Sequence, residues 1–313
     1  MTENESPSVL RLTYYYLRLG RPLFLLGGIL LHGLGVVMAL YSGVKLDIAT
    51  LLWTQIAITA IQLMTHYSND YYDLAADEAN TSPTRWSGGS QILAKGLLPP
   101  QVALITAMTM AVVALFAALW LVVVLETGPL TMPLILLAGI LGWSYSSPPL
   151  QLNMHGLGEI TGAALITGLT PIVGYYMQAG GLNLLPFLAV FPLACLQFAM
   201  LMVVNFPDAE GDMASGKHTL LYFVGSQRAV RLYLGALALA YLSLPLLVWL
   251  GLPIQVALAL LLIAPMAIGQ GWRMWRGAWA DPARWDSLGF WSIGLVMSSA
   301  GVEFVAFLLL YLR

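Results

Sequence analysis

The sequence predicts an all-α membrane protein in which nine transmembrane helices form a single domain, residues 1–313. Three observations carry this prediction. The first is composition, because 59% of the residues are apolar and only 9% are charged, whereas a soluble domain carries about 25% charged residues. The second is a series of apolar runs whose lengths are close to the roughly 20 residues that a helix needs to cross a bilayer. The third is the unequal distribution of Lys and Arg between the two ends of these runs.

The apolar runs follow one another without a segment that resembles an interdomain linker. They are residues 22–42, 48–69, 101–125, 131–148, 157–178, 184–206, 229–250, 253–273 and 289–311. The stretch just before them, RLTYYYLRLGRP, mixes Arg with Tyr, a composition typical of a segment in the lipid headgroup region. We therefore expect one continuous domain surrounded by membrane lipid.

The positive residues give an orientation. If the N-terminus lies in the cytoplasm, 11 of the 13 Lys and Arg residues fall on the cytoplasmic side, and only Lys45 and Arg313 fall outside. This is the asymmetry expected of a multi-pass protein of the cell membrane. The net charge of -2 gives no indication of a nucleic-acid partner.

Two acidic clusters lie at the predicted cytoplasmic ends of the second and sixth runs. The first, NDYYDLAADEA at residues 69–79, contains Asp70, Asp73 and Asp77 at spacing i, i+3 and i+7. The second, NFPDAEGDMASGK at residues 205–217, repeats this spacing with Asn205, Asp208 and Asp212. Such spacing predicts three side chains on one face of a helix. Either cluster alone is typical of a solvated helix end, but the repetition favours a common function.

Stacked acids repel one another, and acids at a helix C-terminus oppose its dipole, so both clusters predict bound cations. Oxygen ligands without His or Cys suit Mg²⁺, and Mn²⁺ is an alternative. The predicted metal ligands are Asp70, Asp73, Asp77, Asp208 and Asp212.

Groups suited to phosphate accompany the acids. Arg85 and Lys95 flank the pair Gly88–Gly89, whose amides could cradle an anion, and Lys217 follows the second cluster. A glycine pair is more often a flexible turn. Beside metal-type carboxylates, however, these residues indicate a bound diphosphate.

These motifs resemble the UbiA-type intramembrane prenyltransferases. The N-D-x-x-D-x-x-x-D pattern covers residues 69–77, and the D-x-x-x-D pattern covers residues 208–212. The resemblance implies nine transmembrane helices around a central cavity that binds polyprenyl diphosphate and an aromatic acceptor. The segments SGGSQILAKGLL, YSSPP, HGLGE and DAEGDMASGKHTL are most similar to the branch that acts on 1,4-dihydroxy-2-naphthoate in menaquinone biosynthesis. That branch usually has Arg at the positions of His155 and Pro207, which keeps another acceptor, such as 4-hydroxybenzoate, as an alternative.

The chemistry gives each candidate residue a role. Loss of diphosphate leaves an allylic cation, and metal ions can neutralise the charge of the leaving group. Asp70, Asp73, Asp208 and Asp212 are the predicted catalytic carboxylates, and Tyr145 is the first choice for stabilising the cation with its ring. Tyr67 and Tyr71 are weaker choices, because most aromatic residues of a membrane protein pack or lie at the interface. The predicted substrate-binding residues are Asn69, Arg21, Arg85, Lys95, Lys217, Asn205 and Glu159.

Other polar residues have more ordinary interpretations. His66 lies one turn before Asp70 and could assist the site, whereas Glu303 lies toward the outer end of its run and is expected to snorkel or to find a partner on another helix. Cys195 lies inside an apolar run and is expected to pack in the core.

An ion-coupled transporter is the competing hypothesis, since it would also carry intramembrane acids. Transporter sites lie near the membrane midplane between repeated halves, whereas the acids here gather at one face. A phosphotransferase acting on a lipid-linked alcohol is a third hypothesis, and no D-G-x-x-A-R signature supports it. The sequence therefore favours a prenyltransferase whose active site faces the cytoplasm.

Overall fold

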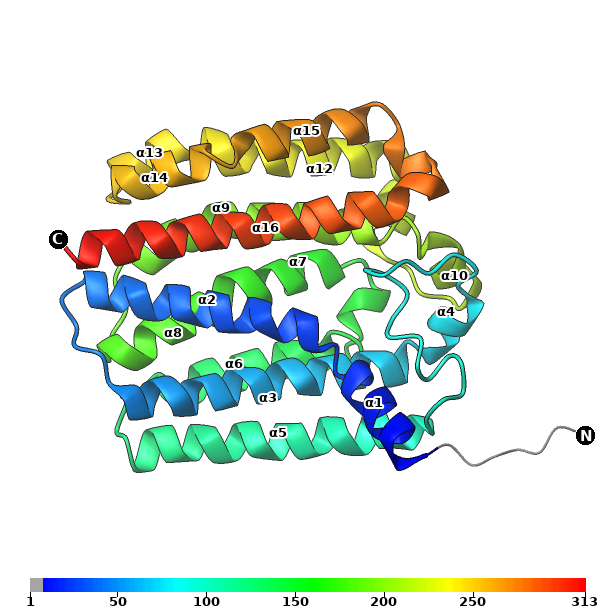
Figure 1. The fold of residues 1–313 in the computed structure, drawn as a ribbon, viewed down its shortest axis with the longest axis horizontal. Helices are drawn as coiled ribbons and strands as arrows, with labels where there is room; N and C mark the ends of the chain where they lie inside the picture. Colours follow the sequence, from blue (N-terminus) through cyan, green and yellow to red (C-terminus); the bar gives the residue numbers. More distant parts are fainter. Residues whose placement is uncertain (1–7) are drawn as a thin grey trace, which may run out of the picture.

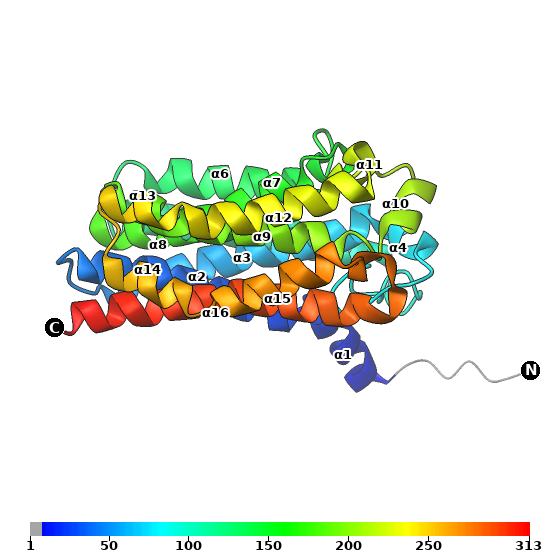
Figure 2. The ribbon, with the colours of Figure 1, turned by 90° about the horizontal axis from the view of Figure 1, so that it is seen from above.

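The computed structural model describes residues 8–313, and the regular secondary structure of this part of the chain is helical, with one isolated bridge between His155 and His218. Most helices run along one long axis as a bundle (Figures 1 and 2). In chain order they are α1 (Val9–Leu19), α2 (Pro22–Tyr41), α3 (Ile48–Tyr72), α4 (Leu74–Ala79), α5 (Pro100–Val123), α6 (Thr131–Ser144), η1 (Leu152–Met154), α7 (Gly158–Ala163), η2 (Ala164–Leu169), α8 (Thr170–Ala179), α9 (Leu185–Val204), α10 (Ala209–Ala214), α11 (Leu220–Val224), α12 (Ser226–Leu242), α13 (Leu244–Trp249), α14 (Ile254–Leu261), α15 (Ala264–Trp275), η3 (Ala278–Ala280) and α16 (Pro282–Tyr311).

Seven helical stretches within residues 8–313 are long and apolar enough to cross a membrane. They are Pro22–Tyr41, Ile48–Tyr72, Pro100–Val123, Gly158–Ala179, Leu185–Val204, Ser226–Trp249 and Pro282–Tyr311. The pair α14 and α15 would give an eighth span, bent by 45°. The protein is thus a multi-pass membrane protein.

The expected count of nine spans is not confirmed. The run at 131–148 forms only the 14-residue helix α6, which at 1.5 Å per residue is about 21 Å long, less than the roughly 30 Å of a bilayer core. The last span also differs from expectation, because α16 begins at Pro282, where Asp281 caps it by accepting a hydrogen bond from the Ala283 amide at 3.1 Å. Nine spans and a cytoplasmic N-terminus stay predictions.

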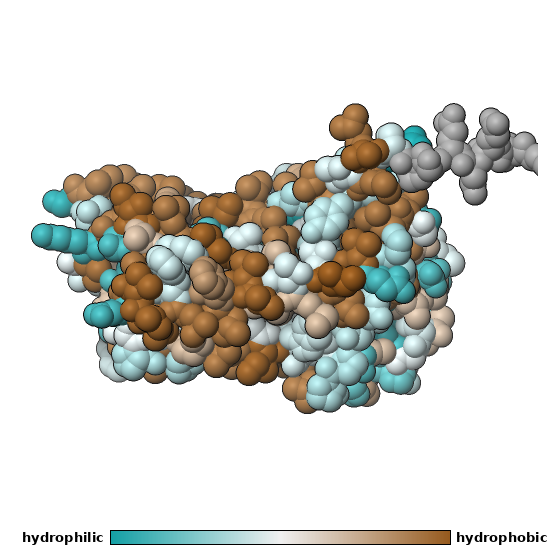
Figure 3. All heavy atoms as spheres, turned by 90° about the horizontal axis from the view of Figure 1, so that it is seen from below, coloured by the Kyte–Doolittle hydropathy of each residue, from teal (hydrophilic) through white to brown (hydrophobic). Residues whose placement is uncertain are grey.

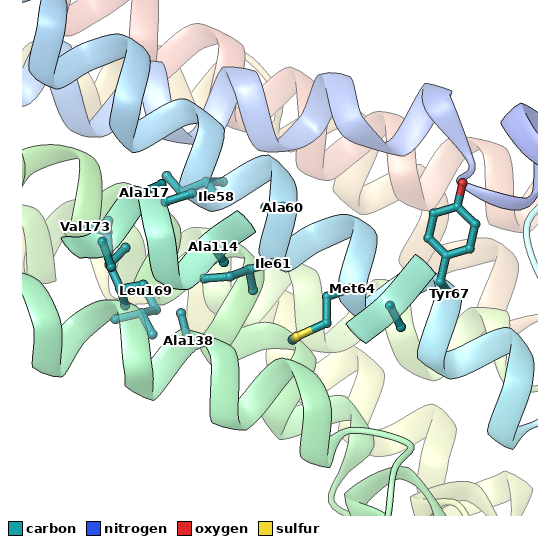
Figure 4. Packing of buried hydrophobic residues seen from close by; sticks show 14 of the residues in the cluster. Ile58, Ala60, Ile61, Met64, Tyr67, Ala114, Ala117, Ala138, Leu169 and Val173 are labelled. Atoms are coloured by element: carbon teal, nitrogen blue, oxygen red, sulfur yellow. The ribbon is translucent and has the colours of Figure 1, made fainter. Parts of the chain in front are cut away.

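Small residues let the helices approach closely, as is usual where lipid removes the hydrophobic drive for association. A side chain added at Gly174 of α8 would lie 2.6 Å from the His32 carbonyl oxygen of α2. Between α3 and α5, the buried core consists largely of Ala, with Ile58, Ile61 and Met64 filling the space toward α6 and α8 (Figure 4). The packing surface of these helices is therefore set by their small residues.

The outer surface agrees with a bilayer location. On the face shown in Figure 3, apolar side chains cover the middle of the bundle and hydrophilic ones gather toward its two ends. The short helices α1, α4 and α10 lie at one end, opposite the C-terminus (Figures 1 and 2). Both acidic clusters are thus brought to the same end of the molecule.

Candidate active site

The two acidic clusters meet because α4 packs against α10. Gly211 lies in this contact, and a side chain there would lie 2.8 Å from the Asn80 Cα atom and 2.9 Å from the Ala76 carbonyl oxygen. Only glycine allows the two backbones to come so close. The first cluster does not occupy one helix as expected, because α3 ends at Tyr72 and α4 continues after Asp73.

Asp70 is buried at the end of α3 and is neutralised by an arginine from the start of α2. Arg21 forms an ion pair with the Asp70 carboxylate and donates a second hydrogen bond, of 3.3 Å, to the Asn69 Oδ1 atom. The Ser90 amide donates to the other Asp70 oxygen at 3.2 Å. Arg21 holds a left-handed backbone with φ 50, which is uncommon for a residue with a side chain. Its placement is therefore imposed by the surrounding structure.

Asp73 accepts hydrogen bonds from three side chains, those of Asn69, Asn153 and Lys217. Lys217 Nζ lies 2.9 Å from one Asp73 oxygen and 3.3 Å from Asp212 Oδ1, so it connects the two clusters. Asn69 Nδ2 donates to Asp73 at 2.8 Å, and Asn153 Nδ2 lies 3.0 and 3.1 Å from its two oxygens. The predicted substrate-binding residues Asn69 and Lys217 are thus in the site, each on a carboxylate.

Asp208 is held by the loop that follows α4. Asn80 Nδ2 donates to one of its oxygens at 2.8 Å, and the Gly88 amide donates to the other at 2.9 Å. Gly88 and Gly89 both have positive φ, 74 and 69, which glycine adopts without strain. In this arrangement the expected anion cradle is partly occupied, because the Gly88 amide already binds a carboxylate of the protein.

The site carries more negative than positive charge. Within residues 8–313, Arg21 and Lys217 are the two cations that form ion pairs with its aspartates, and they pair with three of the five, Asp70, Asp73 and Asp212. Burial, reinforced by Asp70, raises the pKa of Asp77 to about 8, and burial raises the pKa of Asp212 to about 6 although Lys217 opposes the shift. Burial also raises the pKa of Asp208.

Lys217 responds in the opposite direction. Burial disfavours its ammonium, but Asp73 and Asp212 outweigh burial and raise the pKa of Lys217 well above its usual value. The lysine therefore stays charged. The local excess of negative charge is what a bound divalent cation would relieve.

The residues fit a metal that binds together with a phosphate ligand. Among residues 8–313, no group of three or more His, Cys, Asp or Glu is arranged to hold an ion by itself. The donors present are oxygens, and the buried Asp212 Oδ2 has no hydrogen-bond partner. Mg²⁺ typically uses one or two carboxylates and completes its coordination with water and phosphate. The five-aspartate ligand set stays a prediction.

Two of the predicted phosphate ligands lie away from this network. Arg85 is exposed, its guanidinium lies 5.7 Å from the Trp86 ring centre, and its backbone amide donates to Asp286. Lys95 is exposed and has no ion-pair partner within residues 8–313. The structure thus does not bring Arg85 or Lys95 onto the aspartates.

A second polar group lies beside the clusters. Asn205 Nδ2 donates to Glu159 Oε1 at 2.8 Å, while the other Glu159 oxygen is buried without a partner. The Tyr145 hydroxyl lies near the first turn of α7, 3.5 Å from where a Gly158 side chain would begin. The Tyr145 carbonyl accepts a hydrogen bond of 2.8 Å from the amide of Asn153, whose side chain bonds Asp73. Glu159, Asn205 and Tyr145 therefore border the same region as the aspartates.

Sequence reasoning missed the amides and hydroxyls that hold the acids. Ser146 accepts from Asn69 at 2.7 Å and from Asn153 at 3.1 Å, and Asn80 holds Asp208. The one available signal was small polar residues in loops beside the motifs. Conversely, His66 bonds the Gly20 carbonyl at 3.0 Å and Tyr67 donates to the Tyr16 carbonyl, so both join α3 to the segment before α2.

The chain is similar to several known proteins. The chain is 26% identical over 210 residues to the 1,4-dihydroxy-2-naphthoate octaprenyltransferase of Bacillus subtilis, a match that covers 67% of this chain and 65% of that protein, just under two thirds of its length. Its fold resembles a UbiA homologue from Aeropyrum pernix K1, with a TM-score of 0.68 and 14% identity over 90% of this chain and 97% of that one. It also resembles a UbiA homologue from Archaeoglobus fulgidus bound to GPP and Mg²⁺, with a TM-score of 0.60 and 17% identity over 92% and 99% of the two chains.

The model of the UbiA prenyltransferase family matches residues 29–294, which include both acidic clusters and most of the helical bundle. A match of this extent, together with the shared fold, identifies the chain at the level of the family. The protein belongs to the UbiA prenyltransferase family.

Proposed function

We propose that the protein transfers a polyprenyl chain from polyprenyl diphosphate to an aromatic acceptor, 1,4-dihydroxy-2-naphthoate, in menaquinone biosynthesis. The observation that carries this proposal is the meeting of two aspartate clusters at one end of the bundle, with Lys217 between them. The named activity of the Bacillus subtilis relative supports the choice of acceptor.

The site would act first on the diphosphate. Asp70, Asp73, Asp77, Asp208 and Asp212 would hold Mg²⁺, which supplies positive charge against the departing diphosphate. Lys217 and Arg21 lie among these aspartates and would donate to the phosphate oxygens. The carbon–oxygen bond breaks, diphosphate takes the electron pair, and an allylic cation remains for the Tyr145 ring to stabilise.

The acceptor would bind beside Glu159 and Asn205. The second oxygen of Glu159 is buried without a hydrogen-bond partner. It could accept a hydrogen bond from a hydroxyl of the aromatic substrate, and this bond would remove the cost of a buried, unpaired polar atom. The ring carbon bearing the carboxylate forms the new bond to the allylic carbon. Carbon dioxide then leaves, and its bonding electrons restore the aromatic ring. With 4-hydroxybenzoate as acceptor, the ring would instead lose a proton and keep its carboxylate.

A transporter fits the protein less well. The family is one of transferases, and the aspartates gather at one end of the bundle, away from the midplane where transporter sites lie.

A product assay tests the proposed function. The purified protein would be incubated with geranyl, farnesyl and longer prenyl diphosphates and with each aromatic acid, with and without Mg²⁺, and the products identified by mass. We expect a prenylated naphthoquinol that has lost carbon dioxide. Transfer to 4-hydroxybenzoate alone would contradict the choice of acceptor, and transfer to no aromatic compound would contradict the proposed reaction.

The raised carboxyl pKa values predict a pH-dependent metal affinity. Asp77, with its pKa near 8, and Asp212, with its pKa near 6, must lose their protons before they bind Mg²⁺. The affinity should therefore fall as the pH decreases from 8.5 to 6, by on the order of 10- to 100-fold. Calorimetric titration of Mg²⁺ in the presence of an unreactive prenyl thiodiphosphate would measure it.

The variant Asp77→Asn is the control for this measurement. It lacks the Asp77 carboxyl, whereas the protonation of the thiodiphosphate is the same as with wild type. It should bind Mg²⁺ more weakly at pH 8.5 and with a flatter dependence above pH 7. An unchanged slope in this variant would show that Asp77 does not bind the metal.

We also propose that the protein lies in the cell membrane with the aspartates facing the cytoplasm. A cysteine at the exposed Ser82, in the loop after α4, should react with an impermeant maleimide only from the cytoplasmic side. One at Gly181, an exposed position between α8 and α9, should react only from outside. Cys195 is half-buried, less buried than expected, so both are placed in a Cys195→Ser background. Labelling of both from one side would contradict this topology.

A further inference from the structure

A groove runs along α15 and α16, and none of the aspartates lines it. Its volume is about 560 Å³, and it is lined by Pro265, Met266, Gly269, Gln270, Arg273 and Trp291. Five of these residues come from α15 at helical spacing, so they form one face of that helix. The groove is apolar at the Pro265 end and carries a cation at the Arg273 end.

Arg273 is held in place by neutral groups. Its Nη1 atom donates to Gln270 Oε1 at 2.7 Å and to the Ser287 carbonyl at 3.4 Å, and its Nη2 atom donates to the Ser287 hydroxyl. Gln270 is 3% exposed and donates to the Leu288 carbonyl and the Ser292 hydroxyl, which fixes its orientation. The arginine is thus positioned by a buried residue.

The charge of Arg273 is not neutralised by the protein. Within residues 8–313, no carboxylate forms an ion pair with it, whereas the nearby Arg284 pairs with Asp281 at 2.9 Å. Three hydrogen bonds use three of its five N–H donors. Two donors and one positive charge therefore remain for a ligand.

The position of the groove indicates the kind of ligand. Arg273 lies at the end of the bundle that also carries α4 and α10 (Figure 1). Around it, Trp272, Trp275 and Trp291 expose 57%, 65% and 45% of their surface, as aromatic residues do at the level of lipid headgroups. An apolar groove that runs from the level of the headgroups toward the bilayer centre has the polarity and direction of a lipid acyl chain.

We propose that this groove binds one anionic phospholipid. Its phosphate would lie on Arg273, and one acyl chain would follow Gly269, Met266 and Pro265 beside Trp291. A free phosphate would use only the arginine, and a neutral lipid would leave its charge unbalanced. The combination of both features favours a lipid with a phosphodiester and a net negative charge.

Native mass spectrometry and thermal melting of detergent-purified protein test this proposal. We expect wild type to retain one phosphatidylglycerol and to melt at a higher temperature when that lipid is added. Arg273→Gln removes the charge, and Gly269→Leu fills the apolar part, since a side chain at Gly269 meets no atom within 4 Å. Each substitution should reduce retention at least fivefold and abolish the thermal shift.

Matched controls make the result specific. Gly235→Leu adds the same side chain to α12, again with no atom within 4 Å, and Arg276→Gln removes an exposed arginine that lies over the Trp272 ring. Both should behave as wild type, and all variants should melt alike without lipid. Equal retention by wild type and Arg273→Gln, or an equal shift with phosphatidylcholine or with soluble glycerol phosphate, would overturn the proposal.

Discussion

Replacing Asp70 or Asp208 with Asn should lower the turnover number by about 100- to 1,000-fold, the size of effect seen when one electrostatic contact to a transition state is lost. Both residues accept hydrogen bonds from loop amides, Ser90 and Gly88, and Asn can keep one such bond. The substitution thus removes charge with little change of shape. Turnover would be measured as prenylated product at saturating Mg²⁺.

Two exposed acids of the same clusters provide the controls. Glu78→Gln and Glu210→Gln remove the same charge from solvent-exposed positions and should retain wild-type turnover. A similar loss in all four variants would indicate a general effect of charge on the protein. Full activity in Asp70→Asn or Asp208→Asn would contradict a metal site built from both clusters.

Melting in detergent separates activity from folding, and the two variants should differ. Asp208 has no cationic partner within residues 8–313, so Asp208→Asn should melt no lower than wild type. Asp70→Asn leaves Arg21 without its ion pair and should melt lower, because an unpaired buried charge is costly.

The substitution Lys217→Met should lower kcat/KM for prenyl diphosphate by about 100-fold or more, since a charged donor to a developing anion is lost. Lys217 is 14% exposed and, within residues 8–313, it is the one residue that forms an ion pair with an aspartate of each cluster. Arginine keeps the charge with a different shape, so Lys217→Arg should be less impaired. Lys45→Met, at an exposed lysine in the loop between α2 and α3, is the control.

Stability gives Lys217→Met a second measurement. Without the lysine, the pKa of Asp212, already raised to about 6, should rise further. An acid whose pKa is higher in the folded than in the unfolded protein favours folding at low pH, and this contribution is lost as the pH rises through the folded pKa. The variant should therefore melt progressively lower than wild type between pH 6 and pH 8. A constant difference in melting temperature would argue against charge as the cause.

The helices and the pairing of the two clusters could be predicted from local patterns. Seven of the nine predicted apolar runs form long spans. The distribution of Lys and Arg predicted that both acidic clusters lie at the same end of the bundle. The bend between α14 and α15 could not be seen, because hydropathy is continuous there and only Pro265 marks a helix start. The shortness of α6 could not be predicted for a similar reason, since the apolar run at 131–148 continues past the end of the helix at Ser144.

The contacts within the site could not be predicted, because they join distant parts of the chain. The spacing of the acids predicted missing cations, and the structure supplies two of them from the protein. Arg21 lies 49 residues before Asp70, and Lys217 lies 144 residues after Asp73. Asn153 and Ser146 reach Asp73 and Asn69 by loops whose path depends on the folded bundle. Local spacing carries no information about such partners.

The ion pairs of Arg21 and Lys217 have a consequence for how the protein is made. Aspartates at the end of a membrane helix are costly to insert and to pack when they stand alone. Here the chain brings its own counter-ions, so folding in the bilayer does not wait for metal or substrate, and chelators should not unfold the protein. In the proposed reaction, an arriving diphosphate would compete with Asp70 and Asp73 for these two cations. Each cation that moved to the diphosphate would free a carboxylate to bind the metal.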